Sequence, residues 1–361
     1  MTLGLSMIVK NEQAVLERCL NGIKSAVDEI VIVDTGSTDN TVQIAKRYTD
    51  KVYSFDWIND FSAARNFALS KVKSDYWMWL DADDIVPECT LNAIKRLKNN
   101  GIAADIVMLP YVAAVDENGK PTYSYYRERI IKNGKRFFWQ GAVHEAVELS
   151  GKITHLNKPI IHQKPIERSG GTRNLDIYRA IIASGKTLSP RERYYYAREL
   201  YFNSLYVEAA NELSAFICGD GGIKANKADA CLLLSDCFIR LGDKKSAMQA
   251  ALYRFAFTSP DGEGCCKVAS LFFAEKDYVS AAYWYERATR GKPDMTSGAF
   301  VQPDYYGFIP LVWLSVCYDR LGDIKRAHRY HIRAKKLKPT DKSIIANDAY
   351  FATKGYTDVN T

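Results

Sequence analysis

Acidic side chains follow two apolar stretches of this 361-residue chain, at the points where the stretches end. Asp34 closes the run Ile30 to Val33, and Asp81-Ala82-Asp83 comes directly after Trp77 to Leu80. The carboxyl ends of the strands in an open α/β sheet border the crevice in which ligands bind, so both groups of acids are expected at one sheet edge. Hard carboxylate oxygens favour Mg²⁺ or Mn²⁺. The pattern therefore predicts a divalent-cation site beside a bound nucleotide sugar.

The chemistry of such a site is the cleavage of a bond between a sugar and a diphosphate. The diphosphate that leaves gains negative charge, which a cation held by carboxylates stabilises. We expect Asp83 and Asp81 to be metal ligands, and His162, which follows a short apolar segment, to complete the ligand set through a ring nitrogen. A histidine beside apolar residues is often structural, and that alternative stays open for His162.

A second candidate group is the pair His144-Glu145. Transfer of a sugar with inversion needs a general base that takes the proton of the acceptor as it attacks. We expect Glu145 to be this base, with His144 orienting either Glu145 or the donor. A structural role for His144 is the alternative.

Further polar residues are expected near the nucleotide. Asp34 can accept hydrogen bonds from a base or a ribose, or it can cap the following helix, although Ser37, Thr38 and Asp39 are better placed for capping. Lys10 and Glu12 follow the first strand at the same edge. Arg65 is either a clamp on the nucleotide or part of a surface salt bridge. Arg127 and Arg129 either neutralise phosphate or lie on a solvated strand face.

Alternating strands and helices must position these residues. Apolar runs predict strands over Leu3 to Val9, Glu29 to Val33, Lys51 to Phe55, the residues before Asp81, and Asp105 to Val115. An aromatic and basic passage from Tyr123 to Trp139 follows, and the sheet is expected to finish there. Amphipathic stretches predict helices over Gln13 to Ser25, Thr38 to Tyr48, Asp60 to Val72 and Thr90 to Asn99. Such alternation predicts a parallel sheet covered by helices.

From about Arg191 the pattern becomes helical throughout and repeats. Leu241-Gly242-Asp243, Lys276-Asp277-Tyr278 and Leu321-Gly322-Asp323 are each followed by a small alanine, and Asp243 and Asp277 lie 34 residues apart. That is the period of tetratricopeptide repeats. We expect about four helical hairpins from Arg191 to Lys338 and a capping helix over Asp341 to Thr353.

Composition and charge bound the remaining possibilities. Apolar residues make up 47% and charged residues 25%, as in soluble globular proteins. The chain shows no stretch of ~18 apolar residues and no signal peptide, so we expect a cytoplasmic protein without an integral membrane segment. The eight cysteines are expected to be reduced core thiols. The net charge of +7 is mild, and the basic run Lys325 to Lys342 is expected to be a solvated helix face, with an anion site as the alternative.

Several enzyme classes are disfavoured. The sequence has no Gly-x-Gly-x-x-Gly after the first strand, no Gly-x-x-x-x-Gly-Lys-Ser/Thr and no Gly-x-Ser-x-Gly. Dinucleotide enzymes, P-loop enzymes and α/β-hydrolases therefore fit poorly. No nucleic-acid-binding motif is evident either, so we expect no nucleic-acid partner.

Five motifs together resemble family 2 glycosyltransferases of the GT-A fold, and their order along the chain also matches. They are Ile8-Val9-Lys10-Asn11-Glu12, Asp34 to Thr41, Asp60-Phe61-Ser62-Ala63-Ala64-Arg65-Asn66, Asp81-Ala82-Asp83 and Gly141-Ala142-Val143-His144-Glu145. Ile161-His162, Arg173-Asn174-Leu175 and Ala197-Arg198-Glu199-Leu200 extend the resemblance to the subgroup of sublancin-type peptide S-glycosyltransferases.

The resemblance implies a GT-A domain over residues 1–185 followed by a tetratricopeptide-like helical repeat domain over residues 190–355. It implies an α-linked UDP-hexose donor, dependence on Mn²⁺ or Mg²⁺, inversion to a β-linkage, Asp83 as the principal metal ligand and an acidic base near Glu145. Within the matching motifs we assign nucleotide-sugar binding to Val9, Lys10, Glu12, Asp34, Arg65, Asp81 and Ala82.

We therefore expect an inverting hexosyltransferase that moves a hexose or N-acetylhexosamine from a UDP-sugar to a peptide or protein side chain. Stacked helical hairpins present a surface suited to an extended polypeptide, or to self-association as a homodimer. One alternative is an enzyme that extends a lipopolysaccharide core or another cell-surface glycan. Another is a non-catalytic tetratricopeptide adaptor.

Overall fold

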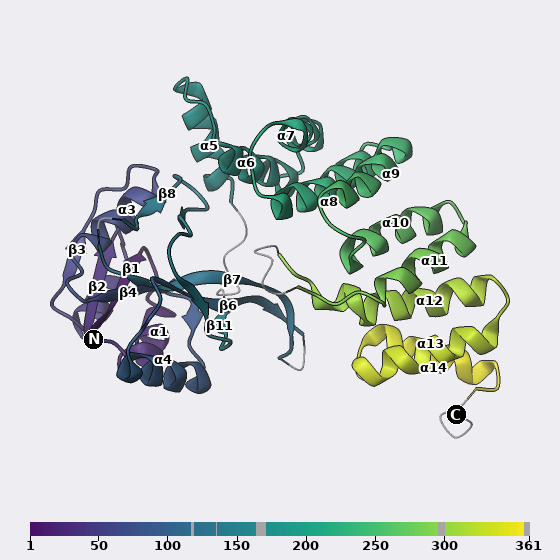
Figure 1. The fold of residues 1–361 in the computed structure, drawn as a ribbon, viewed down its shortest axis with the longest axis horizontal. Coiled ribbons are helices and arrows are strands. Elements are labelled where there is room, and N and C mark those ends of the chain that lie inside the picture. Colours follow the sequence, from purple (N-terminus) through teal and green to yellow (C-terminus); the bar gives the residue numbers. More distant parts are fainter. Residues whose placement is uncertain (117–118, 135, 164–170, 295–299, 357–361) are drawn as a thin grey trace. The chain divides into compact units, whose positions relative to one another are not determined.

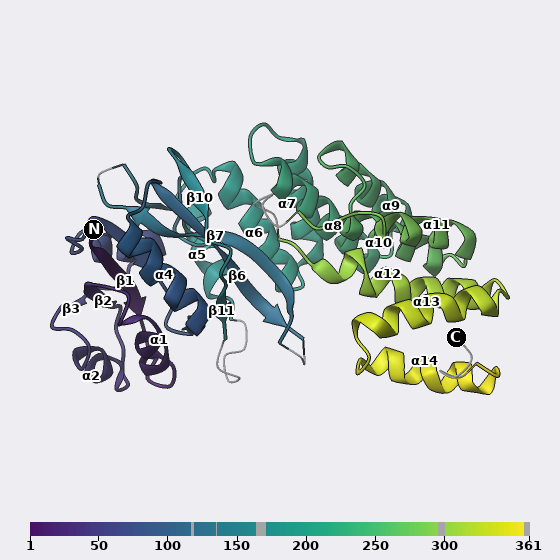
Figure 2. The ribbon, with the colours of Figure 1, turned by 60° about the horizontal axis from the view of Figure 1, so that its bottom comes forward.

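The computed structural model describes residues 1–116, 119–134, 136–163, 171–294 and 300–356. The chain divides into two compact units, Met1–Tyr195 and Tyr196–Thr361, which are here called unit 1 and unit 2 (Figures 1 and 2). Unit 1 holds a mixed α/β fold, and unit 2 is built from helices.

A mixed sheet forms the centre of unit 1, with the strand order β3-β2-β1-β4-β7-β6-β11-β5 and β10 paired to β6. Its first four strands are parallel, whereas β7 runs antiparallel to both β4 and β6. The register places Val9 beside Asp34, so the carboxyl ends of β1 and β2 are level. The strands of this sheet are β1 (Leu3–Val9), β2 (Glu29–Asp34), β3 (Val52–Ser54), β4 (Tyr76–Trp79), β5 (Asp84–Ile85), β6 (Ile106–Val115), β7 (Pro121–Lys132), β10 (Ile153–His155) and β11 (Ile160–His162).

Two apolar layers cover the two faces of the sheet. Successive side chains of a strand point to opposite faces, so Tyr76 and Met78 join one layer while Trp77 and Trp79 join the other. The first layer packs against α1 (Leu16–Ile23), α2 (Thr41–Lys46) and α4 (Glu88–Asn100). The second lies under α3 (Phe61–Leu69) and the hairpin of β8 (Trp139–Gln140) and β9 (Ala146–Val147).

The predicted alternation of strands and helices is confirmed, with two differences. The sheet does not finish with the passage from Tyr123 to Trp139, because β7 lies at its centre between β4 and β6, and β10 and β11 join the same sheet later in the chain. The helix expected from Thr38 begins at Thr41 instead. Of the expected caps, Asp39 accepts a hydrogen bond from the amide of Thr41 at the start of α2. Ser37 and Thr38 instead bond to Asn11: the Ser37 hydroxyl accepts from the amide of Asn11, and the Asn11 side chain accepts from the amide of Thr38.

The helices of unit 2 form consecutive antiparallel hairpins followed by one further helix, as the repeat pattern predicts (Figure 2). Together with α5 (Arg173–Ala183) of unit 1, the helices after the sheet are α6 (Pro190–Phe202), α7 (Tyr206–Cys218), α8 (Lys224–Arg240), α9 (Lys244–Tyr253), α10 (Gly262–Ala274), α11 (Tyr278–Ala288), α12 (Phe308–Arg320), α13 (Ile324–Leu337) and α14 (Lys342–Thr353). The segment between the third and fourth hairpins, from α11 to α12, is the longest connection between these hairpins, and its residues 295–299 lie outside the described residues.

The four hairpin turns share one backbone conformation. A residue with positive φ lies at each turn, and the next amide donates to the carbonyl five residues before it, which ends the first helix. The four residues are Ser204 (φ 63°), Gly242 (φ 83°), Lys276 (φ 64°) and Gly322 (φ 82°). In the last three turns an aspartate follows and caps the second helix, with its carboxylate accepting from the amide three residues on.

The eight cysteines are unpaired thiols, as expected, but the expectation that they lie in the core is wrong for two of them. Six are buried, whereas Cys89 and Cys218 are exposed. Among the described residues, no helix combines the length and the apolar character needed to cross a membrane.

The turn at Lys276 generates a stability prediction. A side chain at positive φ is strained, so we expect Lys276→Gly to raise the free energy of unfolding by about 1 kcal/mol. Gly322→Ala, in the equivalent turn and with open space around the added methyl group, should lower it by a similar amount. Urea unfolding followed by circular dichroism measures both changes. A loss of stability in Lys276→Gly would contradict the account of the turn.

Candidate active site

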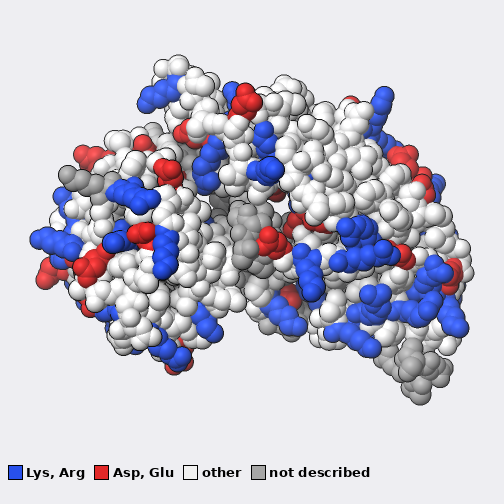
Figure 3. Space-filling view, in the orientation of Figure 1, with Lys and Arg blue, Asp and Glu red and all other residues white. Residues whose placement is uncertain are grey.

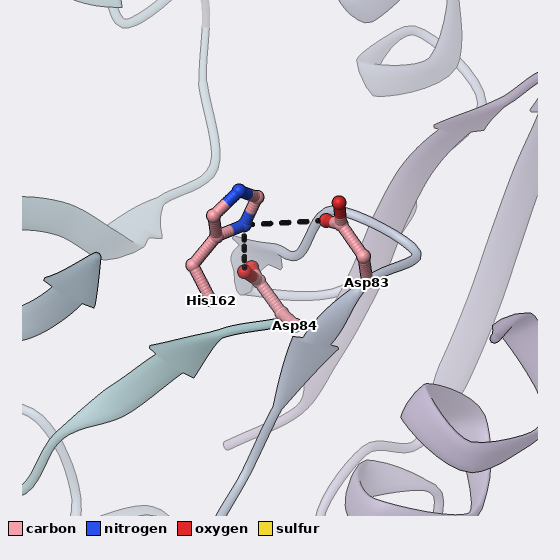
Figure 4. Close-up of side chains that lie close together, drawn as sticks. All are labelled: Asp83, Asp84 and His162. Carbon is pink, nitrogen blue, oxygen red and sulfur yellow. Dashed lines mark ion pairs between the residues drawn. The ribbon is translucent and has the colours of Figure 1, made fainter. Parts of the chain in front are cut away.

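Asp83, Asp84 and His162 form a compact group of potential metal ligands beyond the carboxyl end of β4 (Figure 4). One ligand atom from each lies within 4.8 Å of the others. The His162 Nδ1 atom lies 3.4 Å from Asp83 Oδ1 and 3.7 Å from Asp84 Oδ1. Asp84 is fully buried, and neither its Oδ1 nor His162 Nδ1 meets hydrogen-bond geometry with a described residue. Two buried polar atoms aimed at one point fit a cation between them.

Strand pairing explains why residues so distant in sequence meet here. The two-residue strand β5 pairs antiparallel with β11, and the register sets His162 directly opposite Asp84. The other oxygen of Asp84, Oδ2, accepts from the backbone amide of Asp81 at 3.0 Å and from Arg129 at 3.0 Å. Its carboxylate is therefore locked, with Oδ1 left toward the histidine.

The charge of His162 follows from its neighbours. Burial alone lowers the pKa of an imidazole, but the carboxylates of Asp83 and Asp84 beside the ring outweigh burial and raise the pKa of His162 to about 9. At neutral pH the ring is therefore a cation in the absence of metal. A bound divalent cation would take the place of that proton, since only neutral imidazole is a metal ligand.

The second candidate group is a chain of ion pairs through Arg65. The guanidinium donates through Nε to Glu145 Oε1 at 2.5 Å and through an Nη atom to Asp81 Oδ1 at 2.8 Å. Arg65 and Glu145 are largely buried, whereas the side chain of Asp81 is 35% exposed. Burial raises the pKa of Asp81, but Arg65 and Arg129 outweigh burial and lower it to about 2. Arg65 is therefore a buried bridge between two predicted site residues.

Three guanidinium groups surround the ring of Trp79, the last residue of β4. The central carbon atoms of Arg65, Arg127 and Arg129 lie 5.0, 4.7 and 3.7 Å from the ring centroid. Each cation has its own carboxylate, and Arg127 pairs with the neighbouring Glu128. Neither Arg127 nor Arg129 lies on a solvated strand face. The indole provides an apolar, electron-rich surface on which the cations stack.

Helix α3 holds the loop that carries Glu145. The Asn66 side chain donates to the backbone carbonyl of Trp139 and accepts from its amide, and the amide of Phe61 donates to the carbonyl of Ala142. Asp60 caps α3 by accepting from the amide of Ala63. The motif from Asp60 to Asn66 thus fixes both the Arg65 clamp and the loop that the clamp reaches.

His144 lies in the same loop with a positive φ of 53°. Its ring stacks on Tyr195 at a centroid distance of 4.3 Å, and its backbone carbonyl accepts from Arg191 at 3.2 Å. Arg191 in turn lies over the Tyr195 ring. The stack fixes the ring of His144 against the start of α6, so His144 and Glu145 are oriented by different partners.

The predicted nucleotide-binding residues Val9 and Asp34 lie side by side at the ends of β1 and β2. Asp34 accepts hydrogen bonds from the amides of Gly36 and Ser37, so it shapes the turn that follows β2. Lys10 is exposed, and the amide of Glu12 donates to Thr41. The structure therefore joins the loops after β1 and β2, and their contact with a nucleotide stays a prediction.

Ala82 is buried between the two predicted metal ligands, Asp81 and Asp83. Those two acids have different partners in the structure: Asp81 forms an ion pair with Arg65, and Asp83 forms one with His162. Metal ligation by Asp81 stays a prediction.

Two features of the site were not predicted from the sequence: Asp84 as a member of it, and the acid partner of Arg129. Asp84 directly follows the Asp81-Ala82-Asp83 motif, and this extra acid was a signal in itself. Arg129 was expected to neutralise phosphate or to lie on a solvated strand face; its ion pair with Asp84 was not predicted, because it depends on β7 pairing with both β4 and β6.

Comparisons with known proteins agree with this geometry. Residues 5–149 match the model of the family described as Glycosyl transferase family 2, so unit 1 carries a family 2 glycosyltransferase domain. Its GT-A sheet is followed by the tetratricopeptide-like repeats of unit 2, and both parts of the predicted fold class are confirmed.

Three curated proteins illustrate the similarity. A TPR repeat-containing protein of Synechococcus elongatus is 34% identical over 145 residues, which cover 40% of this chain and 35% of that protein. The SPbeta prophage-derived glycosyltransferase SunS of Bacillus subtilis is 33% identical over 148 residues, covering 40% of this chain and 34% of SunS. The lipopolysaccharide core biosynthesis glycosyltransferase LpsC of Rhizobium meliloti is 23% identical over 217 residues, covering 56% of this chain and 80% of LpsC. The matched segment thus spans about a third of the first two relatives.

The Arg65 clamp generates a prediction on stability. Arg65→Met leaves the buried carboxylate of Glu145 without its partner, so we expect a loss of about 3 kcal/mol in the free energy of unfolding. Glu145→Gln removes that charge, so the double variant should be more stable than the sum of the single losses by about 1 kcal/mol or more. Urea unfolding of the wild type, the two single variants and the double variant gives the four free energies of unfolding that this double-mutant cycle needs. Additive losses would show that the two residues do not interact.

Proposed function

We propose that this protein is an inverting, metal-dependent glycosyltransferase that moves a hexose or N-acetylhexosamine from a UDP-sugar to a peptide or protein side chain. The observation that carries the proposal is that a cluster of potential metal ligands lies next to two carboxylates held by an arginine, at one edge of the sheet. Asp83, Asp84 and His162 bring ligand atoms together, those of Asp84 and His162 without a hydrogen-bond partner, and Asp81 and Glu145 are held by Arg65 beside them. A cation site next to a positioned carboxylate supplies what sugar transfer from a diphosphate requires.

The residues fit Mn²⁺ or Mg²⁺ as the bound ion. Two carboxylates and one imidazole favour a hard or borderline cation, and the buried unsatisfied Oδ1 of Asp84 faces the place where it would lie. When bound, the ion would stabilise the negative charge on the departing diphosphate. Asp83 and His162 are the ligands we assign first, with Asp84 as an additional one.

The residues of the chain then divide the remaining work. Glu145 takes the proton of the acceptor as the acceptor attacks the sugar carbon, and Arg65 holds the accepting carboxylate in place. The cation at Arg65 also keeps Asp81 ionised, so Asp81 can accept hydrogen bonds from the donor. Asp34, Val9 and the loop after β1 line the edge where the nucleotide would lie.

The acceptor is the least constrained part of the proposal. Resemblance to the sublancin-type peptide S-glycosyltransferases and the repeats of unit 2, an architecture suited to extended polypeptides, support a peptide or protein acceptor. The similarity to LpsC extends over most of that protein and favours a second candidate, transfer to a lipopolysaccharide core or another cell-surface glycan. Incubation with a UDP-sugar and Mn²⁺, followed by mass spectrometry of peptides and of glycan acceptors, separates the two.

Metal dependence gives the first test. We expect hydrolysis of a UDP-sugar, screened over a panel of donors, to require Mn²⁺ or Mg²⁺. Asp83→Asn should lower this activity at least about 100-fold, because the variant loses a charged ligand of the ion. Asp50→Asn, which removes an exposed acid of the same unit, is the matched control and should leave it unchanged. Full turnover in Asp83→Asn would reject the metal assignment. Absence of metal-dependent UDP binding to the wild-type protein would instead favour the non-catalytic adaptor.

The assignment of Glu145 gives the second test. Glu145→Gln keeps an acceptor for Arg65 but removes the base, so transfer should fall about 10²- to 10⁴-fold. Calorimetric binding of UDP with Mn²⁺ should stay within about twofold of the wild type, since binding does not need the base. Glu148→Gln, an exposed neighbour in sequence, is the control. Unchanged transfer in Glu145→Gln would move the role of base to another residue.

A further inference from the structure

The net charge of the protein is concentrated in one short segment of unit 2. Residues 320–342 hold nine lysines and arginines and two aspartates, a net charge of +7, which equals the formal charge of the whole chain. The rest of the sequence is therefore neutral on balance. Figure 3 shows Lys and Arg gathered over the part of unit 2 that contains α12 and α13.

The basic side chains form a single stripe on α13. Lys325, Arg329, Arg333 and Lys336 are exposed and recur every three or four residues, which places them on one side of a helix. The opposite side is buried and consists of Ala327, His328, His331 and Ala334. The stripe extends over 11 residue steps, about 17 Å at the rise of an α-helix. Helix α13 itself contains no acidic residue.

Three carboxylates near α13 are already engaged by other cations. Asp323 pairs with Arg326, Asp348 with Lys335 and His331, and Asp304 with Lys338. The four residues of the stripe have no carboxylate partner among the described residues, and only Arg333 contacts a ring, that of Tyr330. Their charges are therefore available to an external anion.

The surroundings of the stripe also bear on the kind of anion. Leu337, at the end of α13, is 44% exposed, and on the contacting helix α14 Ile345 is 57% exposed. A basic helix face with exposed apolar residues beside it is typical of segments that lie on a membrane surface. Four charges in a straight row match a dense, laterally mobile layer of phosphate groups, which can adapt to any spacing.

We propose that the α13 stripe, Lys325, Arg329, Arg333 and Lys336, docks unit 2 on an anionic lipid surface. Binding is electrostatic and needs neither a defined lipid pocket nor catalytic activity, so it stands or falls independently of the proposed glycosyl transfer. The attraction is screened by salt, because the charges are exposed.

The test is flotation of the full chain with vesicles. Wild-type protein should float with vesicles of phosphatidylcholine and phosphatidylglycerol at low salt, but neither with pure phosphatidylcholine nor at high salt. The variant with Gln at all four stripe positions should bind at least about 100-fold more weakly, since each basic residue near an anionic surface contributes roughly a factor of five. Circular dichroism and the melting temperature check that the variant is folded, and Gln is a good helix former.

A matched variant separates the stripe from overall charge. Gln at Lys224, Arg240, Lys245 and Arg290, four exposed basic residues elsewhere in unit 2, removes the same charge and should bind vesicles as the wild type does. Equal loss in both variants would overturn the proposal, as would unchanged binding of the stripe variant. Tighter, stripe-dependent binding of polyglutamate than of vesicles would overturn the lipid assignment in favour of an acidic polypeptide.

Discussion

Crowding of like charges at the end of β4 is the constraint on which the site depends. Asp81, Asp83, Asp84 and Glu145 would repel one another in a partly buried place, and Arg65 and Arg129 prevent this by pairing with three of them. The guanidinium groups of Arg65 and Arg129 are themselves buried cations, and both lie over the ring of Trp79. Removing one partner leaves a buried charge uncompensated, which is costly in a protein interior.

The acids of the site differ in how their negative charge is compensated, and this difference suggests the role of each. Arg65 neutralises the acids that would hold the donor and take the proton, so their positions are fixed before any ligand binds. Among the described residues the carboxylate of Asp83 forms no ion pair with an arginine, and its ion-pair partner is the ring of His162; Arg18 bonds only to the backbone carbonyl of Asp83. A site where proton and metal compete for the same imidazole is well suited to binding a divalent cation reversibly.

The sequence predicted much of this arrangement, because strand ends and helix caps have local signals. Asp83 and His162 were predicted as a pair from their positions after apolar runs, and the structure brings them together. The role of Arg129 could not be predicted, since it depends on β7 crossing the sheet between β4 and β6, a long-range pairing with no local signature. The sequence also left open whether Arg65 clamps a nucleotide, whereas the structure shows its ion pairs to Asp81 and Glu145.

The central claim is that a cation binds between β4 and β11 and holds a nucleotide diphosphate at this sheet edge. A crystal structure with Mn²⁺ and UDP, using the anomalous signal of manganese to locate the ion, tests it most directly. The account predicts one anomalous peak within bonding distance of Asp83 and His162, with the diphosphate on its open side. A peak elsewhere, or UDP bound away from this edge, would contradict it.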